Sequence, residues 1–314
     1  MESEQVYGIT FDVGGTTIKG AAVTGEGRVE EGTFTQVDSR SGASAGEILD
    51  NLYITIKNTA ERTRTLCPQA RIAGVGFAFP GPFDYVRGIS FMRGLNKFDA
   101  LYGVNVKEEL MRRIATDALL GGMFVPPVRI VFGNDASMFA LGEAHFGAAR
   151  RYRRSVCLTI GTGLGSGFVE EGRLVERRDD VPEDGWLYRL PWKNGIVDDA
   201  ISRRGILRMA EEMGLAPGIT DVKELALEAQ AGNAAARALF ERFGDELAEV
   251  LSAYAVPFRP EGIVLGGQIS RSFELFAASL RERLAALHVK AEVVRSADSL
   301  HSTFRGILHE LLPA

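Results

Sequence analysis

The sequence predicts an α/β protein built from two related halves. Segments typical of strands alternate with segments typical of helices along the chain of 314 residues, and this alternation is the pattern of α/β architecture. In addition, one unit of strand, glycine turn and strand occurs over residues 7–23 and again over residues 155–170. Such a recurrence indicates an internal repeat. At about 150 residues per domain, the length also fits two domains.

Local signals place the elements of the first half. Ser44 and Glu47 are spaced as a capping box, so a helix is expected over residues 44–66. A buried strand over residues 72–79 is stopped by Pro80-Gly81-Pro82. Periodicity and turn residues predict the remaining elements, which are strands over residues 7–13, 18–23, 28–36 and 128–132 and helices over residues 106–120 and 136–146.

The second half opens in the same way, with a glycine turn between two strands. Its predicted strands cover residues 155–160, 167–170, 262–265 and 291–295, and its predicted helices cover residues 234–255, 273–288 and 303–311. No low-complexity linker separates the halves, and the junction is expected near Gly133. We therefore expect a small N-terminal lobe of residues 1–133 with 297–314 and a larger C-terminal lobe of residues 134–296.

Composition excludes several classes of protein. With 36 Lys and Arg against 41 Asp and Glu, the formal net charge of −5 argues against general nucleic-acid binding. Two cysteines and four histidines argue against a disulfide framework and against a metal site of nitrogen and sulfur ligands. The N-terminus lacks the pattern of a signal peptide, and no apolar run is long enough to span a membrane. We expect a cytoplasmic protein in which the basic run 150–154 is a solvated loop.

Two glycine turns are the first candidates for chemistry. Glycines let backbone N–H groups approach a phosphate closely, although Gly-Gly also suits a simple hairpin turn. Two such turns facing each other can hold a polyphosphate between them, which favours a nucleotide site. The residues expected to contact the nucleotide are Asp12, Gly14, Gly15, Thr16 and Thr17 in the first turn and Gly161, Thr162 and Gly163 in the second.

Two further segments each allow two interpretations. Asp135, in Gly133-Asn-Asp-Ala136, could accept a proton from a hydroxyl nucleophile, or it could simply cap the helix that follows. Small residues around Gly266 and Gly267, after a buried strand, leave room for a flat ring such as adenine. The same segment could instead be a helix entry capped by Ser270.

Taken together, these motifs resemble the ROK family of repressors, open reading frames and sugar kinases. The resemblance covers nearly the whole chain and carries five motifs in order: Asp12-Val-Gly-Gly-Thr-Thr-Ile-Lys-Gly20, Phe79-Pro-Gly-Pro82, Gly133-Asn-Asp-Ala136, Ile160-Gly-Thr-Gly-Leu-Gly-Ser-Gly167 and Gly266-Gly267. It implies an actin-like, hexokinase-like (ribonuclease H-like) fold of two lobes around a cleft. It also implies that Asp135 is the general base, and that Gly81, Asn96 and Asn134 contact a sugar.

The sequence departs from this family at its zinc loop. Glu183-Asp-Gly-Trp186 matches the family's ExGH motif with Trp in place of His, and Gly195-Ile-Val-Asp198 matches GCxE without the Cys. The intervening loop is short, so we expect no structural zinc. Glu183, Trp186 and Asp198 remain candidates for sugar binding, although Trp186 could equally be packing where the loop was lost.

The resemblance implies an ATP-dependent kinase that phosphorylates a primary hydroxyl, O6, of a hexose or hexose derivative. Mg²⁺ would accompany ATP, with Asp12 able to hold a metal-bound water. The expected partner is the sugar, with no nucleic acid and no membrane, and a homodimer is the habit of the family. Two alternatives stay open: a sugar-binding sensor without a DNA-binding domain, and polyphosphate as the phosphoryl donor.

Overall fold

The structure is a computed structural model that describes residues 5–215 and 221–312. The chain divides into two compact units, Met1–Gly142 with Leu300–Ala314, and Glu143–Ser299. The sequence-based division placed residues 134–142 in the second lobe, whereas their contacts assign them to the first unit. Among the described helices, none is both long and apolar enough to cross a membrane.

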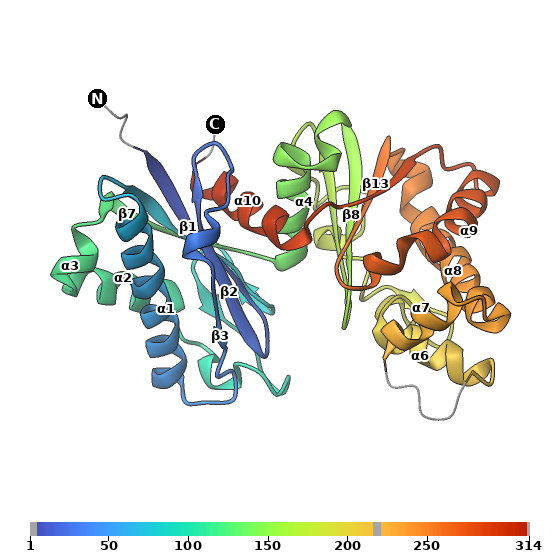
Figure 1. The fold of residues 1–314 in the computed structure, drawn as a ribbon, viewed down its shortest axis with the longest axis horizontal. Helices are drawn as coiled ribbons and strands as arrows, with labels where there is room; N and C mark the ends of the chain where they lie inside the picture. The colour runs from blue at the N-terminus through green and yellow to red at the C-terminus, as the bar shows by residue number, and fades with distance from the viewer. Residues whose placement is uncertain (1–4, 216–220, 313–314) are drawn as a thin grey trace. The chain divides into compact units, whose positions relative to one another are not determined.

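A five-stranded sheet with the order β3-β2-β1-β4-β7 forms the centre of the first unit (Figure 1). The two strands after β1 fold back as an antiparallel meander, and β4 and β7 then add in parallel to the other side of β1. The strands are β1 (Val6–Val13), β2 (Thr17–Thr24), β3 (Thr35–Asp38), β4 (Arg71–Ala78) and β7 (Phe124–Gly133), and a small hairpin is formed by β5 (Phe83–Asp84) and β6 (Ile89–Ser90).

The two faces of this sheet are covered differently. On one face, Phe11 and Phe77 belong to a hydrophobic cluster with buried residues of α1 (Ala45–Leu66) and α2 (Val106–Thr116). The other face is lined by glycines, and α10 (Ser299–Leu311) lies close against it, since a Cβ at Gly76 would stand 2.1 Å from Ile307. Helix α4 (Asp135–Phe146) crosses α10 at a similarly close contact between Gly142 and the backbone of Ser302.

The second unit repeats the same sheet, with the order β10-β9-β8-β13-β14. Again an antiparallel meander is extended by two parallel strands, so the internal repeat predicted from the glycine turns is confirmed. The strands are β8 (Arg154–Ile160), β9 (Leu164–Glu170), β10 (Arg173–Leu174), β13 (Gly262–Gly266) and β14 (Glu292–Arg295). Helices α8 (Ala234–Phe258) and α9 (Phe273–Ala286) pack on it through a core that includes Phe243 and Phe276.

Two predictions in the first half were wrong in part. Residues 28–36 do not form one strand, because Thr33 turns inward, accepts a hydrogen bond from the Ala22 N–H (2.8 Å) and sits in a short 3₁₀ helix, Glu31–Thr33. The helix predicted over 106–120 is two helices, α2 and α3 (Ala118–Gly121). It breaks at Asp117, whose carboxylate accepts hydrogen bonds from the N–H groups of Leu119 and Leu120 and so caps a new helix.

No helix or strand was predicted between β10 and α8 of the second unit. This segment contains a small hairpin of β11 (Pro191–Trp192) and β12 (Gly195–Ile196), followed by α5 (Val197–Ala200), α6 (Arg203–Glu212) and α7 (Val222–Gln230). The hairpin lies between the Glu183-Asp-Gly-Trp186 motif and Asp198, which is part of α5.

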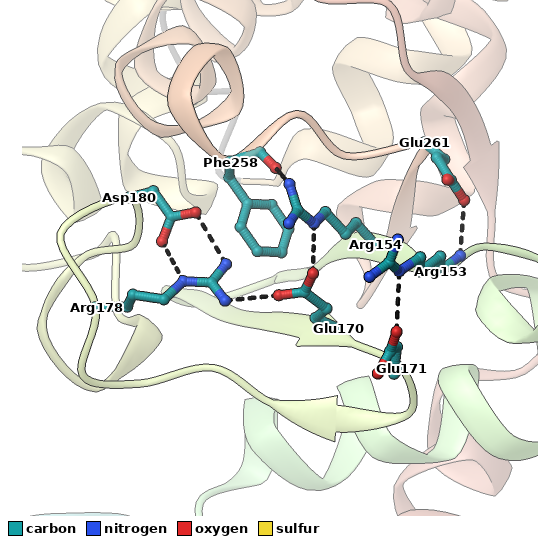
Figure 2. A network of polar contacts seen from close by, with 8 residues as sticks. All are labelled: Arg153, Arg154, Glu170, Glu171, Arg178, Asp180, Phe258 and Glu261. Atoms are coloured by element: carbon teal, nitrogen blue, oxygen red, sulfur yellow. Dashed lines mark hydrogen bonds and ion pairs between the residues drawn. The ribbon is translucent and has the colours of Figure 1, made fainter.

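A network of ion pairs fastens the residues that lead into this segment (Figure 2). Glu170, at the end of β9, accepts hydrogen bonds from Arg154 (2.7 Å) and Arg178 (2.6 Å), and both guanidinium groups lie over the ring of Phe258. These hydrogen bonds lower the pKa of Glu170. Arg178 also pairs with Asp180. The end of the basic run predicted as a solvated loop is therefore part of a strand and is ion-paired.

Candidate active site

The first glycine turn joins β1 to β2 directly after Asp12. The N–H of Gly14 donates to the carbonyl of Thr17 (2.9 Å), so the turn does have the hairpin character that Gly-Gly allows. The carbonyl of Gly15 faces inward and accepts hydrogen bonds from the hydroxyls of Ser39 (2.8 Å) and Ser41 (2.5 Å). With this carbonyl held by two hydroxyls, the turn has a defined conformation.

Asn134, and not Asp135, is the main cap of helix α4. Its side-chain oxygen accepts hydrogen bonds from the N–H groups of Ala136 (3.0 Å) and Ser137 (3.3 Å). Asp135 accepts a bond from the adjacent Ala136 N–H (2.9 Å) and interacts with the side chain of Asn134, and Asp135 is exposed to solvent. Because Asn134 takes the capping role, the Asp135 carboxylate is not needed to cap α4.

The negative charge of Asp135 acts on the carboxylate of Asp12. Loss of hydration, followed by the negative charge of Asp135, raises the pKa of Asp12 to about 6, while Lys19 lowers it. The surrounding protein raises the pKa of Asp135 although its side chain reaches solvent, and the Ala136 N–H and the charge of Lys97 lower it. Asp12, Asp135 and Lys97 therefore form one electrostatic cluster.

The loop expected to contact the sugar is built on an aromatic core. The ring of Phe79 packs on Phe83 and Phe98, with centroids 4.9 and 5.4 Å away. Its carbonyl accepts a hydrogen bond from the hydroxyl of Tyr85 (3.1 Å). Gly81, two residues after Phe79, lies against the same hydroxyl, which would stand 3.1 Å from a Cβ at this position. Asn96 is exposed and has a left-handed backbone, with φ of 56°.

In the second unit, Asp198 holds the second glycine turn. Its carboxylate accepts a hydrogen bond from the N–H of Leu164 (2.7 Å) and pairs with Arg204 (2.6 Å). A Cβ on Gly163 would lie 2.8 Å from the same carboxylate, so a side chain there would displace Asp198. Asp198 was predicted as a sugar contact, and in the structure one of its oxygens is bonded to the second glycine turn.

The segment around Gly266 and Gly267 packs against the same glycine turn. The φ of Gly267 is 84°, and a Cβ there would lie 2.4 Å from the carbonyl oxygen of Ile160, the residue just before Gly161. The hydroxyl of Ser270 donates to the Gly267 carbonyl (2.7 Å). The predicted adenosine segment and the second glycine turn are thus adjacent in space, although they are about a hundred residues apart in the sequence.

Glu183 and Trp186 lie on a short irregular segment beside β9. The hydroxyl of Ser166 donates to the Gly185 carbonyl (2.7 Å) and accepts from the Leu187 N–H (2.9 Å), which fixes the backbone around Trp186. The indole N–H of Trp186 is buried and has no hydrogen-bond partner in the described part of the chain. The guanidinium of Arg189 lies over the indole, 4.5 Å from its centroid.

Two interactions of charged residues were missed in the sequence. Lys97 follows the predicted sugar contact Asn96, yet nothing in its spacing indicates that its charge acts on Asp135. Glu246, on α8, is only 6% exposed and accepts hydrogen bonds from Trp192 (2.8 Å) and Lys193 (2.6 Å) of the small hairpin. A lone carboxylate within a long helix gives no sign of such a contact.

Comparison with known proteins places the chain in a family. It is 27% identical to a glucokinase from Thermotoga maritima over 296 residues, and this alignment covers 88% of this chain and 86% of that protein. It is 31% identical to an N-acetyl-D-glucosamine kinase from Pectobacterium carotovorum over 198 residues, and this alignment covers 57% of this chain and 62% of that protein.

Solved structures of sugar kinases have a fold similar to that of this chain. The crystal structure of a ROK family glucokinase from Streptomyces griseus, in complex with glucose and AMPPNP, matches with a TM-score of 0.72 at 21% identity, over 96% of this chain and 98% of the other. The hexokinase-like α/β fold expected from the sequence is thereby confirmed. The family profile itself, that of the ROK family, matches residues 7–306, and the chain therefore belongs to the ROK family.

Proposed function

We propose that this protein is an ATP-dependent sugar kinase that phosphorylates a primary hydroxyl, O6, of a hexose or hexose derivative, with Asp135 as the general base. The curated relatives, which are named as kinases of glucose and of N-acetyl-D-glucosamine, support the class of reaction. The observation that carries the assignment of the base is the capping of α4 by Asn134, because it frees Asp135 from the capping role while the charge of Asp135 acts on Asp12.

The chemistry required of the site is modest. The sugar oxygen attacks the γ-phosphorus of ATP, a new P–O bond forms, the bond to the β-phosphate oxygen breaks, and ADP leaves. Asp135 accepts the proton of the attacking hydroxyl. In phosphoryl transfer most of the catalysis comes from positioning and from neutralising charge, so rigid backbone turns and a placed carboxylate are the features needed.

We assign the nucleotide to the glycine turns. Gly14, Gly15, Thr16 and Thr17 would contact the phosphates from the first unit, Gly161 to Gly163 from the second, and Gly266 with Gly267 would lie by the adenosine. Mg²⁺ neutralises charge on the β- and γ-phosphates when it is bound. The donor set suits it, because Mg²⁺ keeps several waters and needs only one or two carboxylates besides phosphates, and Asp12 would supply one through water.

We assign the sugar to Gly81, Asn96 and Asn134 of the first unit and to Glu183 and Trp186 of the second. The side-chain oxygen of Asn134 is engaged in capping, so only its amide NH₂, which also interacts with the Asp135 carboxylate, would donate to a sugar oxygen. The unpartnered indole N–H of Trp186 supports a hydrogen bond from this residue to a sugar oxygen. Asp198 would contribute indirectly, by holding the second glycine turn.

A coupled assay over a panel of sugars tests this proposal, with ATP and inorganic polyphosphate as alternative donors. Glucose, N-acetylglucosamine, N-acetylmannosamine and a β-glucoside should be included, and NMR of the product should show phosphate on O6. The Asp135→Asn variant should lose at least about 10²-fold in kcat and still bind the sugar, as measured by calorimetry.

Asp245→Asn is the matched control, because Asp245 is an exposed aspartate of α8. It should retain full activity. Sugar binding without sugar-dependent turnover in the wild-type protein would favour a sensor over a kinase. Full activity of Asp135→Asn would refute the assignment of the base.

A further inference from the structure

Lys97 lies between two residues with left-handed backbones, Asn96 and Phe98, whose φ angles are 56° and 57°. Asparagine adopts this region readily, but for a bulky residue such as Phe it carries an energetic cost and persists where the surrounding structure over-determines it. The backbone next to Lys97 is therefore fixed by its surroundings.

The surrounding contacts hold this loop against the first glycine turn. Phe98 is fully buried, and its N–H donates to the carbonyl of Ser41 (2.7 Å). The hydroxyl of the same Ser41 donates to the carbonyl of Gly15. The side chain of Lys97 lies directly over Gly15, where its Cδ would stand 3.2 Å from a Cβ. A side chain at position 15 would therefore press on that of Lys97.

The charge of Lys97 acts on the carboxylate of Asp135, and the charge of Asp135 in turn acts on Asp12. Within residues 5–215 and 221–312, no side chain forms an ion pair with its ammonium group within the usual 4.0 Å. A cation placed beside a phosphate turn and two carboxylates, without a fixed partner, is suited to meet an anion that arrives during the reaction.

We propose that Lys97 is a catalytic residue whose ammonium group contacts the phosphoryl group as it passes from the nucleotide to the sugar oxygen. This inference rests on the proposed function. During transfer, negative charge on the three phosphoryl oxygens comes close to the carboxylates of Asp12 and Asp135. Lys97 offsets that repulsion while the bond to the sugar oxygen forms and the bond to ADP breaks, and the hydroxyl proton goes to Asp135.

Steady-state kinetics of Lys97→Met and Lys97→Arg test the proposal. Lys97→Met should lower kcat by about 10²–10³-fold, as loss of one preorganised group at developing charge does. The sugar dissociation constant should stay within about twofold of wild type, since the lysine is proposed to act in the transition state. The melting temperature should stay within about 2 °C of wild type. Lys97→Arg keeps the charge and should recover at least about tenfold of the loss.

Arg93→Met is the matched control. Arg93 is an exposed cation four residues earlier in the same loop, and it lies over the ring of Tyr102. Its loss should leave kcat within twofold of wild type. As an independent readout, ADP with aluminium fluoride and the sugar should form a tight complex with wild-type protein, and Lys97→Met should bind that complex at least about 10²-fold more weakly.

A kcat of Lys97→Met within threefold of wild type would overturn the inference. A raised sugar KM with unchanged kcat would overturn it too, because Lys97 would then be a sugar-binding residue. If Lys97→Met does not fold, Lys97→Gln, measured in the same kinetic and aluminium fluoride assays, decides the question. A wild-type protein that turns over no sugar at all would instead refute the proposed function.

Discussion

Replacement of Glu246 by Ala should destabilise the second unit markedly. The Glu246 carboxylate is 6% exposed and accepts hydrogen bonds from the indole N–H of Trp192 (2.8 Å) and from Lys193 (2.6 Å). Burial by itself raises the pKa of Glu246, but the hydrogen bonds from Lys193 and Trp192 outweigh it and lower that pKa. The carboxylate is therefore ionised and bonded in the folded protein.

The magnitude follows from the exposure of each partner. Lys193 is 57% exposed, so solvent screens its ion pair, which is worth about 0.2–1 kcal/mol. The hydrogen bond from Trp192 to the buried carboxylate is worth about 1.5–3 kcal/mol. We expect Glu246→Ala to lower the free energy of unfolding by about 2–3 kcal/mol, or the melting temperature by roughly 4–12 °C.

Urea unfolding and calorimetry measure this effect. Glu249→Ala is the control, since Glu249 lies three residues later on α8 in an exposed ion pair with Arg283 and should cost less than about 1 kcal/mol. The difference between wild type and Glu246→Ala should be complete above about pH 5 and shrink below the ordinary glutamate pKa of about 4.3. Equal costs for the two variants, or a pH-independent difference, would refute the reasoning.

Three further perturbations are expected to have measurable effects. Asp12→Asn should raise the melting temperature at pH 7.5, because the raised pKa of Asp12 (about 6) makes its ionised form unfavourable in the folded state; the gain should vanish below about pH 4, and kinase activity should be lost. Gly142→Ala should lower the free energy of unfolding by at least about 3 kcal/mol, because its Cβ would lie 1.7 Å from the Ser302 carbonyl oxygen. Gly46→Ala should stabilise α1, because nothing lies within 4 Å of the added Cβ. Denaturant unfolding measures both effects. Arg178→Met should lower the free energy of unfolding by about 1 kcal/mol, and this effect should fall by half in 0.5 M salt. Replacement of the more exposed Arg153 by Met should lower it by less than about 0.5 kcal/mol. An effect of Arg178→Met that does not depend on salt would contradict the ion-pair explanation.

Features with local causes were readable from the sequence. The capping box of Ser44 and Glu47 is present at the start of α1, as its spacing predicted. The two strand–glycine–strand units each form the antiparallel meander expected of them, and both sheets share one strand order. Hairpins and caps depend on residues a few positions apart, and so a single sequence contains the information for them.

Other features depend on contacts between distant segments, and the sequence alone was ambiguous or silent about them. Asn134 and Asp135 are both good capping residues, and only the backbone geometry shows that Asn134 takes that role. Lys97 reaches Gly15 and the charge of Asp135 because a loop is folded back by the buried Phe98. The order of elements and the motifs of the chain were therefore determined by local sequence. Which carboxylate is left available, and which cation stands beside it, was decided by packing, because hydrogen bonds and charges act through space and not along the chain.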